Sequence, residues 1–316
     1  MSKPKVLLLD PFHPRGMELL EEKAEIVFAR GIDEDTLVED ARDVQGIAVR
    51  ARGFISRRIM ENAPQLKVVG RHGVGVDNID IDAATDLGIW VVNTPLATIE
   101  PVAEHAIALM LALAKLVVRT DRLMRRGKWR EQGDFQGREL KGKTLGIIGT
   151  GRIGARVAEI ARLGLGMEIV YSDVRPNARV EELGGRRCSL DDLLKESDFV
   201  TLHVPLLPET EYMIGERELN LMKPTAYLLN LARGKVVNEA ALITALQAGR
   251  IAGAGLDVYE VEPLPSDSPL LHMENVVLTP HMSSHTEEAL VAMSMVTQDI
   301  VAVLNGQTPQ FPVNRV

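Results

Sequence analysis

The sequence contains little that would place the chain outside the cell or in a membrane. Cys188 is the only cysteine among 316 residues, so no intramolecular disulfide can form, which fits a reducing compartment. The N-terminus carries no hydrophobic stretch of the kind found in secretory signals. The longest apolar run, residues 106–114, is too short to span a bilayer. These absences predict a soluble, cytoplasmic protein with no membrane partner.

An excess of positive charge is also absent. The formal net charge is −8, whereas proteins that bind nucleic acid usually present a basic face, so we expect no nucleic-acid partner. Small anionic substrates are compatible with this charge, because a few local arginines can dominate a pocket. With 46% hydrophobic and 25% charged residues, the composition is that of an ordinary globular protein, and the length predicts two domains.

Residues 143–154 contain the most informative motif. A short apolar run leads into Gly149, Gly151 and Gly154, which have G-x-G-x-x-G spacing, and residues 155–163 then show helical periodicity. Such glycines permit a tight strand-to-helix turn, close approach of the backbone to a pyrophosphate, and packing of the helix on the strand. Asp173 follows about 20 residues later, where an acid can bind ribose hydroxyls. A glycine-rich surface turn is the alternative, and it is disfavoured because strand, helix and acid are all in place.

The first part of the chain alternates between strand and helix patterns. Expected strands lie at 5–9, 25–29, 46–50, 66–70 and 89–92, and helices at 14–22, 34–43 and 56–62. This alternation predicts a parallel sheet with helices on both faces. Residues 10–14, which come directly after the first strand, contain no glycine-rich loop, so we expect this unit not to bind a nucleotide.

The middle of the chain predicts a connection between two domains. Residues 101–126 form one long helical pattern, expected as a single helix that links the domains. Residues 125–140 are polar and irregular but contain Trp129 and Phe135. Contact with another subunit and ordinary surface packing are both open interpretations of these rings.

A second α/β unit begins at Lys143. Further strands are expected at 168–172, 199–204, 226–231, 252–258 and 276–278, giving about six strands, as in a doubly wound dinucleotide domain. A last helix, 289–304, is expected to return to the first domain because the cofactor sheet is already complete. We therefore predict a substrate domain from residues 1–98 and 287–316 and a cofactor domain from residues 99–286.

Four ionisable residues come after strands of the second half: Arg233, Asp257, Glu262 and His281. Each alone could be structural, as a surface arginine, a strand-end cap, a solvated acid or a packed loop histidine. Ligands of open α/β sheets bind outside the carboxyl ends of the strands. Together with a dinucleotide fold, the four residues therefore favour an active site.

Six motifs together resemble the signatures of one enzyme family. They occupy residues 73–80, 93–95, 142–154, 230–234, 255–263 and 279–281. The chain resembles the D-isomer-specific 2-hydroxyacid dehydrogenases over nearly its whole length and in the same order. Within that family it is most similar to the D-3-phosphoglycerate dehydrogenases that lack a C-terminal regulatory domain.

The resemblance implies a fold and an activity. The fold would be α/β, with two doubly wound parallel-sheet domains, a flavodoxin-like substrate domain and a Rossmann domain for NAD. The activity would be that of an NAD-dependent oxidoreductase acting on the CH–OH group of a D-2-hydroxy acid. A homodimer and no metal site are expected.

The family's catalytic and substrate residues can be transferred to matching positions. Arg233 would bind the substrate carboxylate and carbonyl, and His281 would donate the proton to the reduced carbonyl. Glu262 would hydrogen-bond His281. The backbone of Val74 and Gly75 would hold the carboxylate.

The resemblance also implies the cofactor contacts. Asp173 would bind the ribose, Arg152 and Ile153 the pyrophosphate, and Asp257 would lie near the nicotinamide carboxamide. NAD should be preferred over NADP, although Arg175 could accommodate a 2′-phosphate. The complete expected cofactor set is Gly149, Gly151, Arg152, Ile153, Gly154, Asp173, His203, Val204, Pro205, Ala232 and Asp257.

These roles make physical sense. Hydride transfer to a 2-oxo acid leaves alkoxide character on oxygen, which a cation and a proton donor must meet. Arg233 can form a forked pair with a planar carboxylate, which lysine cannot. Histidine suits both reaction directions, because its unperturbed pKa lies near 6.5.

Arg50 and Arg71 come after strands of the first domain and suggest a second anionic group, such as phosphate, on the substrate. Arg52 and His72 could add positive charge, whereas solvated surface arginines are the alternative. We therefore expect a substrate pair like 3-phosphoglycerate and phosphohydroxypyruvate.

Other functions stay open. A glyoxylate or hydroxypyruvate reductase, another oxidation of the family such as that of formate or phosphonate, and an NADH-sensing corepressor-like binding protein are the alternatives. Three departures from the family pattern concern the substrate. Asn238 stands where the family often has Asp, and residues 282–285 stand where relatives commonly have glycine and small residues. Ala51 and Gly53 replace residues that are polar in the phosphoglycerate branch.

Overall fold

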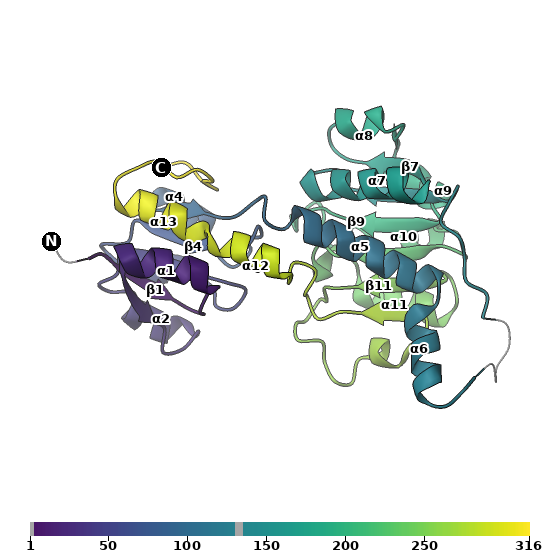
Figure 1. Ribbon diagram of the computed structural model, residues 1–316, viewed down its shortest axis with the longest axis horizontal. Coiled ribbons are helices and arrows are strands. Elements are labelled where there is room, and N and C mark those ends of the chain that lie inside the picture. Colours follow the sequence, from purple (N-terminus) through teal and green to yellow (C-terminus); the bar gives the residue numbers. More distant parts are fainter. Residues whose placement is uncertain (1–2, 130–134) are drawn as a thin grey trace. The chain divides into compact units, whose positions relative to one another are not determined.

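The computed structural model describes residues 3–129 and 135–316. The chain divides into two compact units (Figure 1). Unit 1 comprises Met1–Thr98 and Ser284–Val316, and unit 2 comprises Ile99–Ser283. Each unit is built around one parallel sheet.

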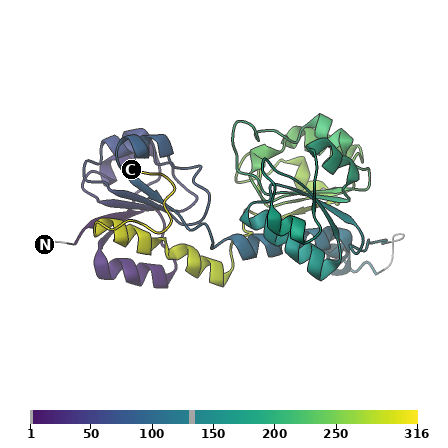
Figure 2. The same cartoon turned by 90° about the horizontal axis from the view of Figure 1, so that it is seen from above.

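Unit 1 has a five-stranded parallel sheet in the order β2-β1-β3-β4-β5. The strands are β1 (Lys5–Leu8), β2 (Glu25–Phe28), β3 (Gly46–Val49), β4 (Val68–Arg71) and β5 (Trp90–Val92). Helices α1 (Pro14–Lys23), α12 (Glu287–Ser294) and α13 (Val296–Leu304) cover one face, and α2 (Glu34–Asp40), α3 (Arg57–Glu61) and α4 (Ile81–Asp86) cover the other (Figure 2). Because both faces are covered, the inner strands read as continuous apolar runs.

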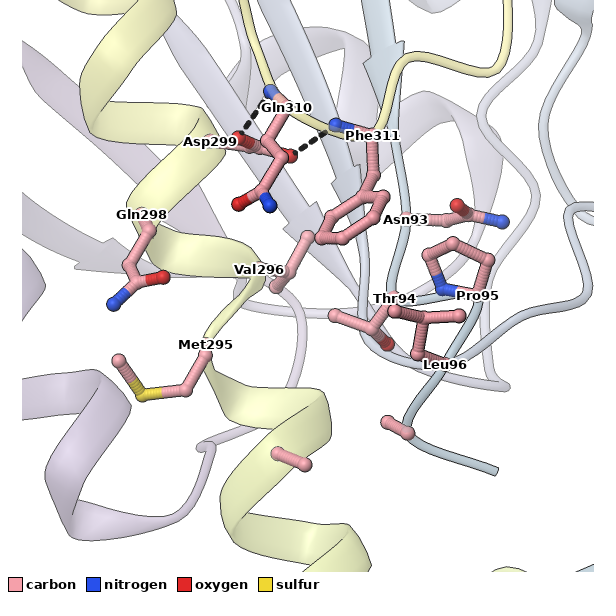
Figure 3. Close-up of a pocket in the computed structure, with 12 residues that line it drawn as sticks. Asn93, Thr94, Pro95, Leu96, Met295, Val296, Gln298, Asp299, Gln310 and Phe311 are labelled. Atoms are coloured by element: carbon pink, nitrogen blue, oxygen red, sulfur yellow. Dashed lines mark hydrogen bonds between the residues drawn. The ribbon is translucent and has the colours of Figure 1, made fainter. Parts of the chain in front are cut away.

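The C-terminal segment is fastened to unit 1 by buried polar side chains. The Asp299 carboxylate accepts hydrogen bonds from the backbone amides of Gln310 (2.7 Å) and Phe311 (2.9 Å), as Figure 3 shows. Farther along, the amide of Val91 donates to the Asn314 side chain at 2.8 Å. A cavity of about 230 Å³ lies among residues 93–97, helices α12 and α13, and this segment.

Unit 2 has a seven-stranded parallel sheet in the order β12-β11-β10-β9-β6-β7-β8. The strands are β6 (Thr144–Ile148), β7 (Glu168–Ser172), β8 (Arg186–Arg187), β9 (Phe199–Leu202), β10 (Tyr227–Asn230), β11 (Gly253–Leu256) and β12 (Val276–Leu278). Strand order reverses between β6 and β9, which is the switch point where doubly wound sheets bind their ligands.

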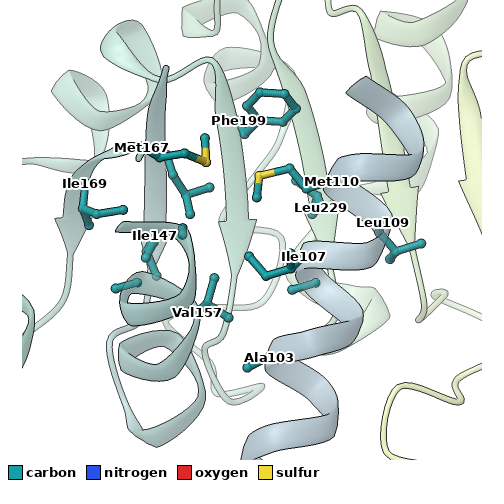
Figure 4. Close-up of a cluster of buried hydrophobic side chains, with 14 of the residues drawn as sticks. Ala103, Ile107, Leu109, Met110, Ile147, Val157, Met167, Ile169, Phe199 and Leu229 are labelled. Atoms are coloured by element: carbon teal, nitrogen blue, oxygen red, sulfur yellow. The ribbon is translucent and has the colours of Figure 1, made fainter. Parts of the chain in front are cut away.

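Helices cover both faces of this second sheet (Figure 2). One face carries α5 (Ile99–Ala114), α7 (Arg152–Leu165) and α8 (Ala178–Glu182), and the other carries α9 (Leu190–Glu196), α10 (Glu216–Leu221) and α11 (Glu239–Gln247). Two short 3-10 helices, η1 (Gly234–Val236) and η2 (Pro269–His272), lie in the connections. Figure 4 shows Ile147, Phe199 and Leu229 of the strands facing α5 and α7. Burying a side chain of this kind contributes about 1.5–3 kcal/mol.

The expected single helix over 101–126 is wrong. Helix α5 ends at Ala114, and a separate helix, α6 (Val117–Arg125), comes after a bend of 62°. Leu116 at the break has a left-handed backbone with φ of +59°. The carbonyl of Ala114 accepts the amide of Arg138 at 2.7 Å. In a continuous helix this carbonyl would accept an amide of the next turn. Because it accepts the amide of a distant segment instead, the helix ends here.

The expected helix 289–304 is likewise two helices, α12 and α13, which meet at Met295. The elements missed from the sequence, β8, α4, α8 and α10, have between two and six residues, too few to show a clear period. Among the described residues, no single helix has both the length and the apolar composition to cross a membrane; α5 and α6 meet that criterion only as a bent pair.

Part of the arm at 125–140 lies outside the described residues, namely 130–134. On its two sides, Trp129 is 68% exposed, and the guanidinium of Arg119 lies 6.0 Å from the ring centre of Phe135. The interpretation of this arm as a subunit contact stays a prediction.

Candidate active site

The turn after β6 requires glycine at two of its three fingerprint positions. Gly149 has φ of +87°, and a Cβ there would come within 2.7 Å of the carbonyl oxygen of His203. A Cβ on Gly154 would overlap the carbonyl of Gly149. Gly151 differs, since a Cβ there would meet nothing within 4 Å. Open space thus lies beside the N-cap of α7, at the switch point of the sheet, as binding of a dinucleotide pyrophosphate requires.

Asp173 comes directly after β7 and is tied to this turn. Its Oδ2 accepts the backbone amide of Thr150 at 2.6 Å and the Thr150 hydroxyl at 3.1 Å, and its Oδ1 accepts the amide of Arg175 at 3.1 Å. Burial raises the pKa of Asp173, but these hydrogen bonds outweigh it, so the net shift of the pKa is downward. The acid is therefore ionised and points toward the fingerprint turn.

His203 comes directly after β9, on the other side of the switch point. Its Nε2 lies 2.9 Å from the hydroxyl of Thr201, and burial lowers its pKa to about 4. The ring is therefore neutral at physiological pH. Val204 is partly buried, and its side chain lies within 2.8 Å of the position a Cβ would take on Gly149, whereas Pro205 is exposed. These neighbours form one wall beside the fingerprint turn.

Arg233 lies in a turn after β10 that Asn230 organises. The Asn230 side chain donates to the carbonyl of Arg233 at 2.9 Å and accepts the amide of Ala232 at 3.1 Å. The guanidinium of Arg233 donates to the carbonyl of Ala232 at 2.7 Å. The turn ends in η1, where a Cβ on Gly234 would overlap the backbone of Tyr259. Asn230 therefore fixes the backbone from which the arginine side chain extends.

His281 and Glu262 form a direct pair. The Nδ1 of His281 lies 2.7 Å from Oε2 of Glu262, and the other carboxylate oxygen accepts the amide of Tyr259 at 3.1 Å. Burial raises the pKa of Glu262, but the hydrogen bond and charge of His281 lower it more, so the net shift of the pKa is downward. An ionised Glu262 holds the proton on Nδ1, which leaves Nε2 of His281 for a ligand.

Asp257 binds the backbone of the loop that carries His281. The carboxylate is fully buried and accepts the amides of Met282 and Ser283, each at 2.9 Å. It also accepts the Thr279 hydroxyl at 2.6 Å, and His105 lies beyond at 3.0 Å from that hydroxyl. The described contacts of this side chain thus go to its own unit.

The loop after β4 is the one that the sequence predicts to bind the substrate carboxylate, and that role stays a prediction. The amide of Gly73 donates to the Thr94 hydroxyl at 3.1 Å, and Asn93 donates to the carbonyl of Val74 at 2.7 Å. Val74 is 36% exposed, and Gly75 is partly exposed. Side chains from the end of β5 therefore hold the backbone of this loop in place.

The expected cationic cluster carries less charge than its sequence suggests. His72 is buried against Phe12, at 4.8 Å between ring centres. Burial, and then the charges of Arg50 and Arg71, lower the pKa of His72 to about 3, so this ring is neutral. Arg52 forms an ion pair with Asp10. Of these residues, Arg50 and Arg71 are the candidate cations for a ligand, although the Arg71 guanidinium also donates to the carbonyl of His72.

Sequence reasoning missed three residues that support this site. Asn230 was part of a motif but had no role, and His105 and Thr279 were not assigned. A histidine among the mostly apolar residues of α5 is the available signal for His105. In the described ranges, no group of three or more His, Cys, Asp or Glu side chains could hold a metal ion.

Known proteins are similar to this chain in sequence and in fold. Residues 107–283 match the D-isomer specific 2-hydroxyacid dehydrogenase NAD binding domain. A glyoxylate reductase of Pyrococcus furiosus is 45% identical over 324 residues, covering 99% of this chain and 96% of that enzyme. A D-3-phosphoglycerate dehydrogenase of Methanocaldococcus jannaschii is 43% identical, but the match covers 98% of this chain and 59% of that enzyme.

A solved structure gives the same result. The NADPH-dependent glyoxylate/hydroxypyruvate reductase of Sinorhizobium meliloti, crystallised with NADP and malonate, is 35% identical, with a TM-score of 0.89 and 100% of both chains covered. These matches confirm the predicted α/β fold with two parallel sheets, the nicotinamide cofactor and the oxidoreductase class. The chain belongs to the D-isomer specific 2-hydroxyacid dehydrogenase family.

Proposed function

We propose that this chain reduces small 2-oxo acids such as glyoxylate and hydroxypyruvate, with NADH as the preferred reductant. The observation that carries the proposal is the pair of His281 and Glu262 at 2.7 Å, in the same unit as the fingerprint turn. A proton donor fixed by a carboxylate is what reduction of a carbonyl requires. When bound, the nicotinamide supplies the hydride.

In this proposal, His281 gives its Nε2 proton to the substrate oxygen as negative charge develops there. Glu262 keeps the ring oriented and stabilises the imidazolium before transfer. Arg233 meets the substrate carboxylate and carbonyl oxygen with its guanidinium, on a turn fixed by Asn230. In the oxidation direction, His281 accepts the proton instead.

The cofactor residues are proposed from the fingerprint turn. Gly149, Gly151 and Gly154 shape the turn, and the first residues of α7, Arg152 and Ile153, offer backbone amides to a pyrophosphate. Asp173 would accept hydrogen bonds from a ribose and repel a 2′-phosphate, which favours NAD. The amide of Arg175 donates to the Asp173 carboxylate at 3.1 Å, and the guanidinium of Arg187 donates to the Asp173 carbonyl at 2.9 Å, so both arginines lie near this acid. They would let the chain use NADP with lower efficiency.

Two observations favour a small substrate over the expected phosphorylated one. The P. furiosus relative, matched over nearly its full length, is named a glyoxylate reductase, whereas the phosphoglycerate dehydrogenase relative extends far beyond the match. In unit 1, a neutral His72 and an Arg52 paired with Asp10 leave less charge for a phosphate. The backbone of Val74 and Gly75 would bind the carboxylate that all 2-oxo acids share.

Phosphohydroxypyruvate remains the second candidate substrate. Arg50 and Arg71 both lower the pKa of His72, so the two guanidinium groups lie close to one buried ring. Two cations near one point could bind a dianionic group.

A screen of NADH oxidation across glyoxylate, hydroxypyruvate, pyruvate and phosphohydroxypyruvate tests the proposal. We expect the highest kcat/KM with glyoxylate or hydroxypyruvate. The highest value with phosphohydroxypyruvate would select the second candidate. NADH binding without turnover of any 2-oxo acid would point to a cofactor-sensing protein.

We also infer that the chain forms a homodimer through α6 and Trp129. Val117 and Met124 of α6 are 53% and 50% exposed, and Trp129 is 68% exposed. Val117 and Met124 are seven positions apart and therefore lie on one face of α6, and exposed apolar side chains on one face favour a protein contact. Sedimentation of the chain and of Trp129→Ser, which we expect to weaken the dimer, tests this inference.

A further inference from the structure

His105 projects from α5 toward the strand ends that carry the candidate catalytic residues. Its Nε2 lies 3.0 Å from the Thr279 hydroxyl and 3.9 Å from Oδ1 of Asp257, and the side chain is only 19% exposed. Most of the other inward positions of α5 are apolar, such as Val102, Ala106 and Leu109. Burying a polar ring at this place costs free energy, and the hydrogen bond to Thr279 offsets that cost.

The direction of the hydrogen bonds is set by the donors available. Thr279 has one hydroxyl proton, and both oxygens of the Asp257 side chain already accept backbone amides, so the hydroxyl donates to Asp257 at 2.6 Å. The same hydroxyl must then accept from His105, so His105 carries its proton on Nε2. The ring thereby fixes the rotation of the hydroxyl, and the chain of donors ends on the carboxylate.

Asp257 connects these hydrogen bonds to the loop that carries His281. Its side chain accepts the amides of Met282 and Ser283, and its own carbonyl accepts the amide of His281 at 2.7 Å. His281 has a left-handed backbone with φ of +50°, which is unfavourable for a residue with a Cβ. The loop therefore needs external hydrogen bonds to hold this conformation, and Asp257 supplies three of them.

We propose that His105 is a positioning residue for His281, acting through Thr279 and Asp257. The inference rests on the proposed function, in which His281 is the proton donor. Glu262 fixes the ring of His281 from one side, and the His105 chain fixes its backbone from the other. Loss of Glu262 or of His105 would leave the proton donor present but in the wrong position, and a small misplacement of a catalytic group lowers the rate strongly.

Tyr259 joins the two supports. Its hydroxyl donates to the carbonyl of Thr279 at 2.9 Å, and its amide donates to Glu262 at 3.1 Å. Burial, and then the charge of Asp257, raise the pKa of Tyr259, so this hydroxyl stays protonated and remains a donor. The charges of Glu262 and Glu239 act on this hydroxyl in the same direction.

The test combines kinetics with a double-mutant cycle. His105→Leu removes the donor, whereas His105→Gln can place an amide N–H near the position of Nε2. We expect His105→Leu to lower kcat for glyoxylate about tenfold, with KM and NADH affinity within about twofold, and His105→Gln to restore most of kcat. Glu104→Gln, at the exposed neighbouring position of α5, is the matched control and should leave all three unchanged.

The cycle with Thr279→Val shows whether the effect passes through the hydroxyl. If it does, adding His105→Leu to Thr279→Val should change kcat by less than about twofold, because the connection is already broken. Independent, multiplicative losses of kcat would overturn the proposal, and so would unchanged kcat in His105→Leu. Should His105→Leu not fold, Thr279→Val against Thr279→Ser tests the same connection, because serine keeps the hydroxyl and valine removes it; equal kcat in these two variants would overturn the proposal.

Amide hydrogen exchange provides a readout that does not need activity. In His105→Leu, the amides of Met282 and Ser283 should exchange about tenfold faster, while those of β6 and α7 keep their rates. Unchanged exchange at both amides would show that His105 does not reach the loop. If the wild-type chain turned over no 2-oxo acid, the proposed function would fail, and exchange would still decide whether His105 supports the loop.

Discussion

The two units share one architecture but differ in the residues directly after the first strand of each sheet. In unit 2, β6 runs into Gly149 with φ of +87°, and open space lies at Gly151. In unit 1, β1 runs into residues 9–13, where Phe12 is 7% exposed and packs on His72. A doubly wound sheet therefore provides a place for a ligand, but the residues after the strand decide whether a phosphate can enter.

The units also differ in the charges at their strand ends. Unit 2 places carboxylates there, and Asp173, Asp257 and Glu262 each accept backbone amides of nearby loops. Unit 1 places Arg50 and Arg71 at the ends of β3 and β4. Carboxylates that bind amides hold a loop in one conformation, whereas arginines attract an anion. We therefore propose that unit 2 supplies the proton donor His281 and the carboxylate-binding Arg233, and that the arginines of unit 1 attract an anion as well.

The largest expected effect breaks the chemistry of unit 2 alone. His281→Ala should lower kcat by about 10²–10⁴-fold, the usual contribution of general acid–base catalysis, without weakening NADH binding. Steady-state kinetics with glyoxylate and NADH titration by fluorescence would measure the two effects separately. Turnover near that of wild type would mean that another group donates the proton.

The fingerprint glycines allow a sharper test of the turn. Gly149→Ala forces a left-handed backbone and places Cβ within 2.7 Å of a carbonyl, so both stability and NADH affinity should fall, the latter on the order of a hundredfold. Gly151→Ala meets no protein atom within 4 Å, so it should weaken NADH binding with little change in Tm. A large loss of Tm in Gly151→Ala would contradict the assignment of that space to the cofactor.

Buried neutral histidines in both units predict sensitivity to acid. The pKa is lowered by burial to about 3 for His72 and about 4 for His203, whereas the unfolded value is near 6.5. The unfolded state therefore binds the proton more readily, so stability is full above pH 6.5 and falls as the pH falls toward 4. At pH 5, each ring should therefore lower the free energy of unfolding by about 2 kcal/mol relative to its value above pH 6.5.

Urea unfolding of the wild type, His72→Phe and His203→Phe at pH 7.5 and pH 5 measures this dependence. Each variant should lose less stability between the two pH values than the wild type does. An equal loss in the wild type and in His72→Phe would show that this ring is already protonated in the folded state.

The smallest expected effect concerns the anion cluster of unit 1. Arg71→Ala should raise KM for glyoxylate and for phosphohydroxypyruvate by a similar factor, about tenfold, if the cation binds the shared carboxylate. Kinetics with both substrates decide the point. A far larger rise for phosphohydroxypyruvate would restore the phosphorylated substrate as the physiological one.

Much of the fold is set by local patterns in the chain. Alternating apolar runs and helical periods place the strands of both sheets to within one or two residues, since the pattern of a strand or helix is carried by adjacent residues. The G-x-G-x-x-G spacing and Asp173 likewise identify the cofactor turn. Elements such as β8, with two residues, escape because they have no period.

The candidate site is predicted only in part. Each of Arg233, Glu262 and His281 alone could be structural. Together they stand out, because all three follow strands of one dinucleotide-type sheet and match motifs that resemble a known family. The role of His105 cannot be seen in the sequence, because its hydrogen-bond partner Thr279 is 174 positions away. Likewise, no local pattern shows that His72 is neutral, since its low pKa comes from burial by residues such as Phe12 and from the charges of Arg50 and Arg71.

The sequence by itself determined the two parallel sheets, the glycine turn and the identity of the ionisable groups, because each depends on neighbouring residues. Only the tertiary structure decided that α5 ends at Ala114, where Arg138 takes its carbonyl. It alone decided that Asp257 binds the loop of His281. These outcomes depend on distances between segments far apart in the chain, and such distances are set by how the helices pack on the sheet.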